Sequence, residues 1–201
     1  MDRSRLQEHK LFRIKQDLTV MVNRYEVTRE GGDGGDADVV AYAEQNWRSF
    51  KEQVTFFTDR TKSQVLFTFK ARSVLDVAGT YDVLDEAGKP IGTFNKKFAA
   101  SLLRSTWGVT QEDGAPPLTG RERSVFVALL RRVWSAVPFV EVLPFAWPYH
   151  FDFSSDGGER AMRVDKNFGV RDSYVLDIES PALDRRLAIA QAVALDALQE
   201  R

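Results

Sequence analysis

Cysteine is absent from this chain of 201 residues, and only two histidines occur, His9 and His150. The absence of cysteine excludes disulfide bonds, thiol catalysis and cysteine-based metal sites. The two histidines are too far apart in sequence to form a local zinc-binding pair. His150 stands beside Asp152, but there is no G-x-S-x-G turn to supply a nucleophilic serine, and no glycine-rich nucleotide motif. We therefore predict no catalytic residue, no metal and no cofactor, and interpret His150 as a structural or partly exposed histidine.

A large excess of one charge sign is also absent, since 28 lysines and arginines face 29 aspartates and glutamates, for a net charge of -1. This balance argues against broad electrostatic binding of nucleic acid, so an anion site must be a local cluster.

Long apolar runs are missing too. The longest stretch without a charged residue covers residues 142–151, and the N-terminal segment MDRSRLQEHK has no apolar signal core. We expect no transmembrane segment and a cytoplasmic location.

The C-terminal stretch, residues 181–201, has the composition of a buried helix. Ser180 can cap it, and Pro181 suits the first helical position. Between residues 187 and 198 only Gln191 and Asp196 are polar, and the apolar side chains point to every side of the helix. A helix that is apolar all round belongs in an interior, and this one is too short to cross a membrane. The rest of the chain must therefore surround it.

Most of the remaining chain alternates apolar with polar residues, which is typical of half-buried strands. One exception is residues 121–136, which we predict to be an additional amphipathic helix that lies against the outside of the sheet or covers an open end of the barrel. No repeat or linker divides the chain, so we expect one domain over residues 1–201, with residues 1–10 as a polar lead. The expected strands are residues 11–16, 19–28, 39–44, 54–58, 64–72, 80–85, 91–98, 103–111, 149–153, 161–165 and 172–179.

These elements together predict a mainly β (α+β) fold. A single sheet covers only one side of a helix, whereas a closed sheet covers all sides and leaves no free edges. An eight-stranded barrel is filled by its own side chains, so a central helix requires a larger one. We expect a closed antiparallel barrel of about 12 strands around the C-terminal helix.

Residues 69–109, FKARSVLDVAGTYDVLDEAGKPIGTFNKKFAASLLRSTWGV, resemble the LURP-one-related and phospholipid-scramblase-like proteins, which are grouped with the tubby C-terminal domains. Residues 184–198 resemble the family's buried C-terminal helix. The resemblance implies a twelve-stranded barrel around that helix. Because a barrel filled by a helix leaves no central pocket for a substrate, we expect a non-enzymatic role. Tubby domains bind phosphoinositide head groups, and scramblases move phospholipids with the help of calcium and a membrane anchor. This chain lacks the scramblases' cysteine-rich lipidation stretch, so we do not expect scramblase activity.

Basic residues on neighbouring strands form the candidate binding site. If Phe67 and Phe69 face inward, strand alternation turns the basic residues between and after them outward. Arginine can bind a phosphate with two parallel hydrogen bonds, and lysine with a point charge. The same residues also suit an ordinary solvated surface, and the sequence leaves both interpretations open. The candidate residues for an anionic phospholipid head group are Lys70, Arg72, Lys96, Lys97 and Arg104.

A protein-interaction or scaffold role is the alternative. Residues 138–148, PFVEVLPFAWP, follow the expected amphipathic helix and are rich in proline and aromatic residues. Phe139, Phe145 and Trp147 would anchor a protein partner if they are exposed together. The other interpretation is that these aromatic side chains close an end of the barrel.

Overall fold

The computed structural model describes residues 6–18, 22–29, 39–46, 53–73, 79–97, 105–123, 150–167 and 173–199. These residues form twelve strands and the helix α3 (Arg185–Gln199). The strands are β1 (Leu11–Leu18), β2 (Val22–Arg29), β3 (Val39–Asn46), β4 (Gln53–Phe57), β5 (Val65–Ala71), β6 (Thr80–Asp85), β7 (Pro90–Lys96), β8 (Thr106–Gln111), β9 (Leu118–Glu122), β10 (His150–Ser155), β11 (Arg160–Asn167) and β12 (Ser173–Ile178).

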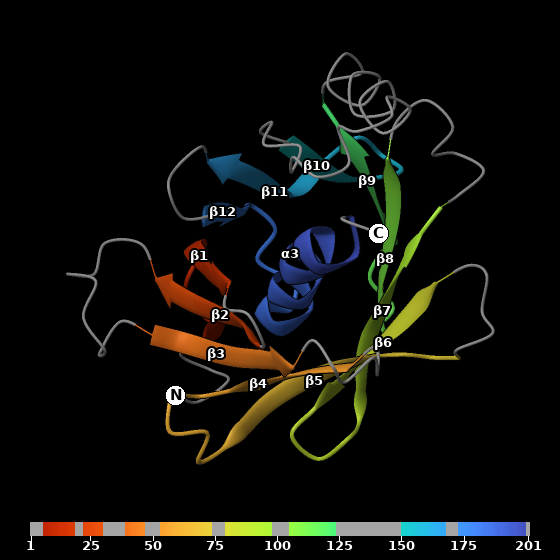
Figure 1. Cartoon of the computed structure of the whole chain (residues 1–201). Helices are drawn as coiled ribbons and strands as arrows, with labels where there is room; N and C mark the ends of the chain where they lie inside the picture. The colour runs from red at the N-terminus through yellow and green to blue at the C-terminus, as the bar shows by residue number, and fades with distance from the viewer. Residues whose placement is uncertain are drawn as a thin grey trace, which may run out of the picture.

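Each strand pairs with its sequence neighbours in antiparallel fashion, and β1 pairs with β12 to close the barrel. Figure 1 shows the ring of strands with α3 running through its interior. This arrangement confirms the fold expected from the strand alternation and the apolar helix. Closure also satisfies the backbone hydrogen bonds that an open sheet leaves unpaired at its edges.

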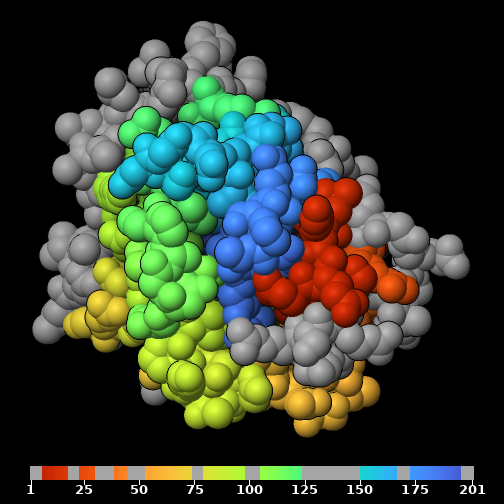
Figure 2. Space-filling view, turned by 180° about the vertical axis from the view of Figure 1, so that it is seen from behind, coloured from red at the N-terminus to blue at the C-terminus, as the bar shows by residue number. Residues whose placement is uncertain are grey.

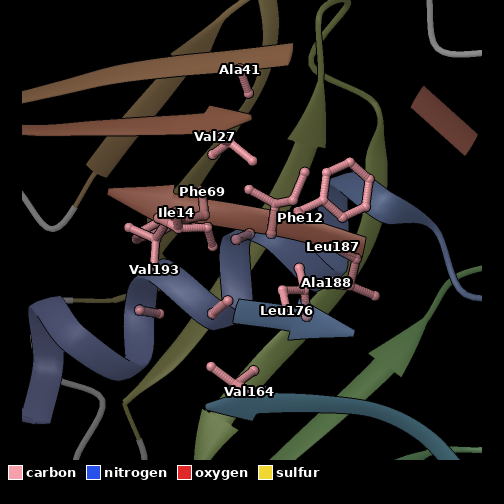
Figure 3. Packing of buried hydrophobic residues seen from close by; sticks show 14 of the residues in the cluster. Phe12, Ile14, Val27, Ala41, Phe69, Val164, Leu176, Leu187, Ala188 and Val193 are labelled. Carbon is pink, nitrogen blue, oxygen red and sulfur yellow. The ribbon is translucent and has the colours of Figure 1, made fainter. Parts of the chain in front are cut away.

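The core consists of the inward-facing side chains of the strands and the whole described surface of α3. From Leu187 to Leu195 every side chain of α3 is at most 1% exposed. Phe12, Val27 and Leu176 belong to the cluster that surrounds the helix (Figure 3). Because the helix is apolar on all sides, burying it removes from water far more surface than a one-sided helix would.

Gly92 on β7 allows the helix to approach the strands closely. A Cβ atom added at this position would lie 2.8 Å from Cδ2 of Leu187 and 2.4 Å from the carbonyl oxygen of Thr110. Real Cβ atoms essentially never come within 3.0 Å of another atom, and the Thr110 oxygen belongs to the backbone and cannot move aside as the end of the Leu187 side chain can. The glycine therefore brings β7 into direct contact with the first turns of α3.

The helix begins later than the sequence suggested. Ser180 and Pro181 lie in a turn, and α3 starts at Arg185. Asp184 takes the capping position, where its Oδ1 atom accepts a hydrogen bond from the backbone N–H of Arg186 at 2.9 Å. The predicted cap at Ser180 was wrong because the chain needs several residues to turn from β12 into the barrel interior.

The predicted helix over residues 121–136 was also wrong at its start. Residues 118–122 form β9, which pairs with β8 on one side and β10 on the other. Closure of the barrel requires a strand at this place, and this tertiary requirement overrides the local preference of a short polar segment. Residues 124–149, which contain the rest of the predicted helix, lie outside the described residues.

Candidate functional site

The outer wall of the barrel carries the basic residues that the sequence singled out. On β5, Phe67 and Phe69 are buried, at 0% and 2% exposure. Lys70 on the same strand is exposed and faces outward, as expected. The guanidinium of Arg72 donates hydrogen bonds to Oδ1 of Asp82, from Nη2 at 2.6 Å and from Nε at 3.1 Å. Asp82 also stands directly opposite Lys70 in the β5–β6 register. A carboxylate therefore lies between these two cations and reduces their attraction for an anion.

Lys96 is the last residue of β7, and Lys97 follows it directly. Lys96 is half-buried and stands opposite Trp107 of β8. Lys97 is exposed, and its Nζ donates a hydrogen bond to Oγ1 of Thr119 at 3.2 Å. The stem of Lys97 crosses Gly108, where an added Cβ atom would lie 3.0 Å from its Cε. The Lys97 ammonium is thus directed across β8 to β9.

Arg121 joins Lys97 on this wall, although the sequence assigned it to a helix. The backbone N–H of Lys97 bonds the carbonyl oxygen of Thr106 at 2.8 Å, and Thr106 pairs with Arg121 in the β8–β9 register. Thr119 and Arg121 lie two residues apart on one strand, so they face the same side. We call Lys97, Thr119 and Arg121 the basic face. Among the residues that the structure describes, no carboxylate lies within ion-pair distance of Arg121.

A sequence signal for β9 does exist. The segment EDGAPP before it forms the β8–β9 turn, and Gly114 in this turn has a positive φ of 84°. Such a conformation favours glycine and is typical of a tight link between strands. A turn of this type predicts a strand after it, which would have placed Arg121 on the sheet.

Next to the basic face, Asp152 of β10 and Asp165 of β11 form ion pairs with neighbouring basic side chains. Oδ2 of Asp152 accepts from Nε of Arg123 at 3.1 Å, and Oδ1 accepts from Nε of Arg163 at 3.2 Å. Asp165 pairs with Arg123 at 2.5 Å and with Nδ1 of His150 at 2.7 Å. The partner of His150 is therefore Asp165 on the facing strand and not Asp152. In the β9–β10 register Asp152 stands directly opposite Arg121, but both of its carboxylate oxygens already accept from Arg123 and Arg163, which reduces its effect on Arg121.

The end of the barrel where α3 begins is organised around a buried arginine. Arg185 is 2% exposed, and its guanidinium donates to the carbonyl oxygens of His9, Ser180, Pro181 and Leu183 at 2.9, 3.1, 3.4 and 2.6 Å. Burial lowers the pKa of Arg185. The arginine holds the N-terminal segment, the turn after β12 and the helix together.

Two glutamines complete this end of the barrel. Oε1 of Gln7 accepts from the backbone N–H of Arg185 at 3.2 Å, and Oε1 of Gln111 accepts from that of Asp184 at 2.6 Å. They satisfy backbone N–H groups that a helix start leaves without a partner. Nε2 of Gln111 also donates to the carbonyl oxygen of Ala182 at 3.3 Å. Gln7 belongs to the segment that we interpreted as a polar lead, and its neighbour Leu6 is only 1% exposed.

A pocket of about 370 Å³ opens beside these contacts. We call it the end pocket. The β8–β9 turn, the β10–β11 turn and the segment between β12 and α3 surround it, and the green, cyan and blue segments meet on this side of the molecule in Figure 2. Its lining residues are Val109, Gln111, Ala115, Pro116, Leu118, Ser155, Glu159, Arg160, Ala161, Glu179, Ser180, Pro181, Ala182 and Leu183.

Several sequence-predicted residues cannot be placed in either region. Arg104, Phe139, Phe145 and Trp147 lie outside the described residues. Within the described ranges, no three or more His, Asp or Glu side chains are grouped so that they could hold a metal ion. No helix in the described part of the chain is long and apolar enough to cross a membrane.

The fold and the surfaces define a class of protein, a closed antiparallel barrel whose interior is occupied by its own C-terminal helix. Because α3 fills the interior, a binding site of this barrel must use its outer wall or its ends. The model of the LURP-one-related family matches residues 39–196, and the chain belongs to this family. A search of curated proteins finds no match to the chain.

Proposed function

We propose that this barrel is a non-enzymatic binding module that recognises the phosphate of an anionic phospholipid head group through the basic face. The observation that carries the proposal is the Lys97 to Thr119 hydrogen bond of 3.2 Å, which brings the ammonium to the strand that bears Arg121. An arginine fork, a lysine charge and a hydroxyl donor together suit a phosphate group. The interior filled by α3 supports a binding role, since it leaves no central chamber for a substrate.

The other sequence-predicted cations have a secondary part in this proposal. Lys96 is the last residue of β7 and the neighbour of Lys97, so it adds positive potential near the basic face. Lys70 and Arg72 lie on β5 and beyond it, with Asp82 between them, so their contribution is smaller. A lipid surface is broad and contacts several such residues at once, each worth about 1 kcal/mol near an anionic membrane.

Co-sedimentation with vesicles tests the proposal. The protein is mixed with vesicles of phosphatidylcholine alone, with added phosphatidylserine, and with added phosphoinositide. We expect binding to rise with anionic lipid and to fall on the double change Lys97→Ala and Arg121→Ala, by roughly 25-fold if each cation supplies about 1 kcal/mol. Both side chains are exposed, so these variants should fold.

The matched control is Lys89→Ala, which removes an exposed lysine from the β6–β7 turn away from the basic face. It should bind vesicles as the unchanged protein does. Phosphoinositide binding above that of phosphatidylserine at equal charge would assign the site to a phosphate monoester. Equal binding to all three vesicles, or full binding by the double variant, would overturn the proposal.

A further inference from the structure

The end pocket has an apolar floor. Leu183 and Ala161 are 2% and 6% exposed, and Val109 is 1% exposed, so the deepest part of the pocket consists of core side chains. Leu118 and Pro116 add apolar surface from the β8–β9 turn. An apolar floor binds the apolar body of a ligand, and the volume of about 370 Å³ lies at the lower end of the range for small-molecule sites.

The charged groups of the pocket carry a net negative charge. Arg160 is held by Glu179, with Nε and Oε1 2.5 Å apart. This hydrogen bond raises the pKa of Arg160, so the guanidinium stays charged and occupied. Among the described residues, no cation pairs with Glu159, which also lines the pocket. Two carboxylates and one guanidinium therefore leave one uncompensated negative charge at the pocket.

The walls of the pocket are fixed before any ligand binds. Gln111 is 9% exposed and bonds both Ala182 and Asp184 across the pocket floor. Arg185 holds Pro181 and Leu183 through their carbonyl oxygens. A preformed site binds with less loss of conformational freedom than a site that must be ordered by its ligand.

We infer that the end pocket binds a small amphiphilic cation, an amine attached to an apolar alkyl or aryl body. The apolar body would lie on Ala115, Pro116 and Leu118, which expose more apolar surface to the pocket than the core side chains below them, and the ammonium would pair with Glu159 at the rim. A fatty acid or another apolar anion would place its carboxylate against the unpaired carboxylate of Glu159, and this repulsion disfavours it. The inference is independent of the basic face, which attracts the opposite charge.

Three compounds of one shape and different charge test this inference. 4-Phenylbutylamine, 4-phenylbutanol and 4-phenylbutyrate are titrated separately into the ¹⁵N-labelled full chain, and the amide shifts of Ala115, Gly157, Ala161 and Ala182 are followed. The amine should move these amides and bind at least about tenfold more tightly than the carboxylate, with the alcohol between them. Equal or tighter binding of the carboxylate would contradict the inference.

Two variants and one control locate the effect. Glu159→Gln should reduce the preference for the amine over the alcohol, since it removes the charge at the rim. Ala115→Leu should weaken all three compounds, because the larger side chain enters the pocket from an exposed turn. Asp156→Asn changes a neighbouring turn residue that does not line the pocket and should have no effect. Unchanged amine binding by both Glu159→Gln and Ala115→Leu would overturn the assignment.

Discussion

The basic face and the end pocket share strand β9 but carry opposite charge. Leu118 at the start of β9 lines the pocket, whereas Thr119 and Arg121 belong to the basic face. Side chains on a strand alternate between the two sides of a sheet, so neighbouring residues reach different surfaces. The comparison teaches that one short strand can contribute side chains to two sites, one on the wall of the barrel and one at its end.

The two regions also differ in how they are held. The basic face rests on exposed side chains on regular strands, where a substitution changes charge and little else. The end pocket depends on buried and part-buried hydrogen bonds of Arg185, Gln111 and Gln7, which also fix the start of α3. Disturbing the pocket walls should therefore cost stability, whereas disturbing the basic face should not.

The largest effect is expected from Arg185→Met. This change removes the guanidinium that donates to the carbonyl oxygens of His9, Ser180 and Leu183. Ser180 and Leu183 keep the backbone N–H of Leu183 and Nε2 of Gln7 as donors, so we expect a loss of about 2 to 4 kcal/mol in the free energy of unfolding, mainly from the unsatisfied carbonyl oxygen of His9 and the lost packing. Urea unfolding followed by circular dichroism measures it. Per folded molecule, amine binding at the end pocket should be lost and vesicle binding retained. Stability within about 0.5 kcal/mol of the unchanged protein would show that Arg185 is not the anchor of this end.

Gly120→Ala should disturb both regions, because Gly120 lies on β9 between them. The added Cβ atom would lie 2.2 Å from Cε1 of Phe153, so this fully buried ring or the strands that carry it must shift. We expect a destabilisation of about 1 to 3 kcal/mol, as for other overpacked cores. The control is Gly157→Ala, where the nearest atom is Oγ of Ser155 at 3.6 Å and the melting temperature should hardly change. Similar melting temperatures for the two variants would contradict the close packing at Gly120.

Salt should separate the two regions without any substitution. Raising NaCl from about 0.1 to about 1 M shortens the screening length from about 10 Å to about 3 Å. Vesicle binding through the exposed cations should weaken by roughly tenfold or more, and amine binding in the half-enclosed pocket by much less. The measurement repeats both titrations at the two salt concentrations. A larger salt effect on the pocket than on the vesicles would reverse our comparison.

The smallest effect is expected from Asp82→Asn. This change removes the carboxylate between Lys70 and Arg72, so it extends the positive surface of the wall from β7 towards β5. Vesicle binding should rise by roughly three- to fivefold, since one surface charge contributes about 1 kcal/mol or less. Asp17→Asn, an exposed aspartate on β1, serves as the control and should raise binding less. A decrease in binding on Asp82→Asn would show that the wall does not attract anions.

The barrel and the buried helix could be predicted because both rest on local patterns. Alternation in β5 buries Phe67 and Phe69 and exposes Lys70, and this pattern repeats around the ring. The position of Arg121 does not follow from alternation, and its local signal is the glycine turn at Gly114 before β9. Its segment, LTGRE, has only one large apolar residue, and it becomes a strand because β8 and β10 both pair with it.

The sequence predicted only part of the candidate site. Strand alternation predicted that Lys70 and Lys97 are exposed, but it did not predict that Asp82 would lie between Lys70 and Arg72. The end pocket was not predicted at all, since its walls come from three turns far apart along the chain. No local pattern reports which turns meet at one end of a barrel.

By itself, the sequence determined the strand period, the all-round apolar character of α3 and the absence of cysteine chemistry, because these depend on residue type and spacing along one segment. Only the tertiary structure decided which side chains meet. Lys97 reaches Thr119 across β8, Arg185 joins residues near both ends of the chain, and Glu159 faces the end pocket. Such contacts depend on strand order, register and turn geometry, which the closing of the barrel imposes on the whole chain at once.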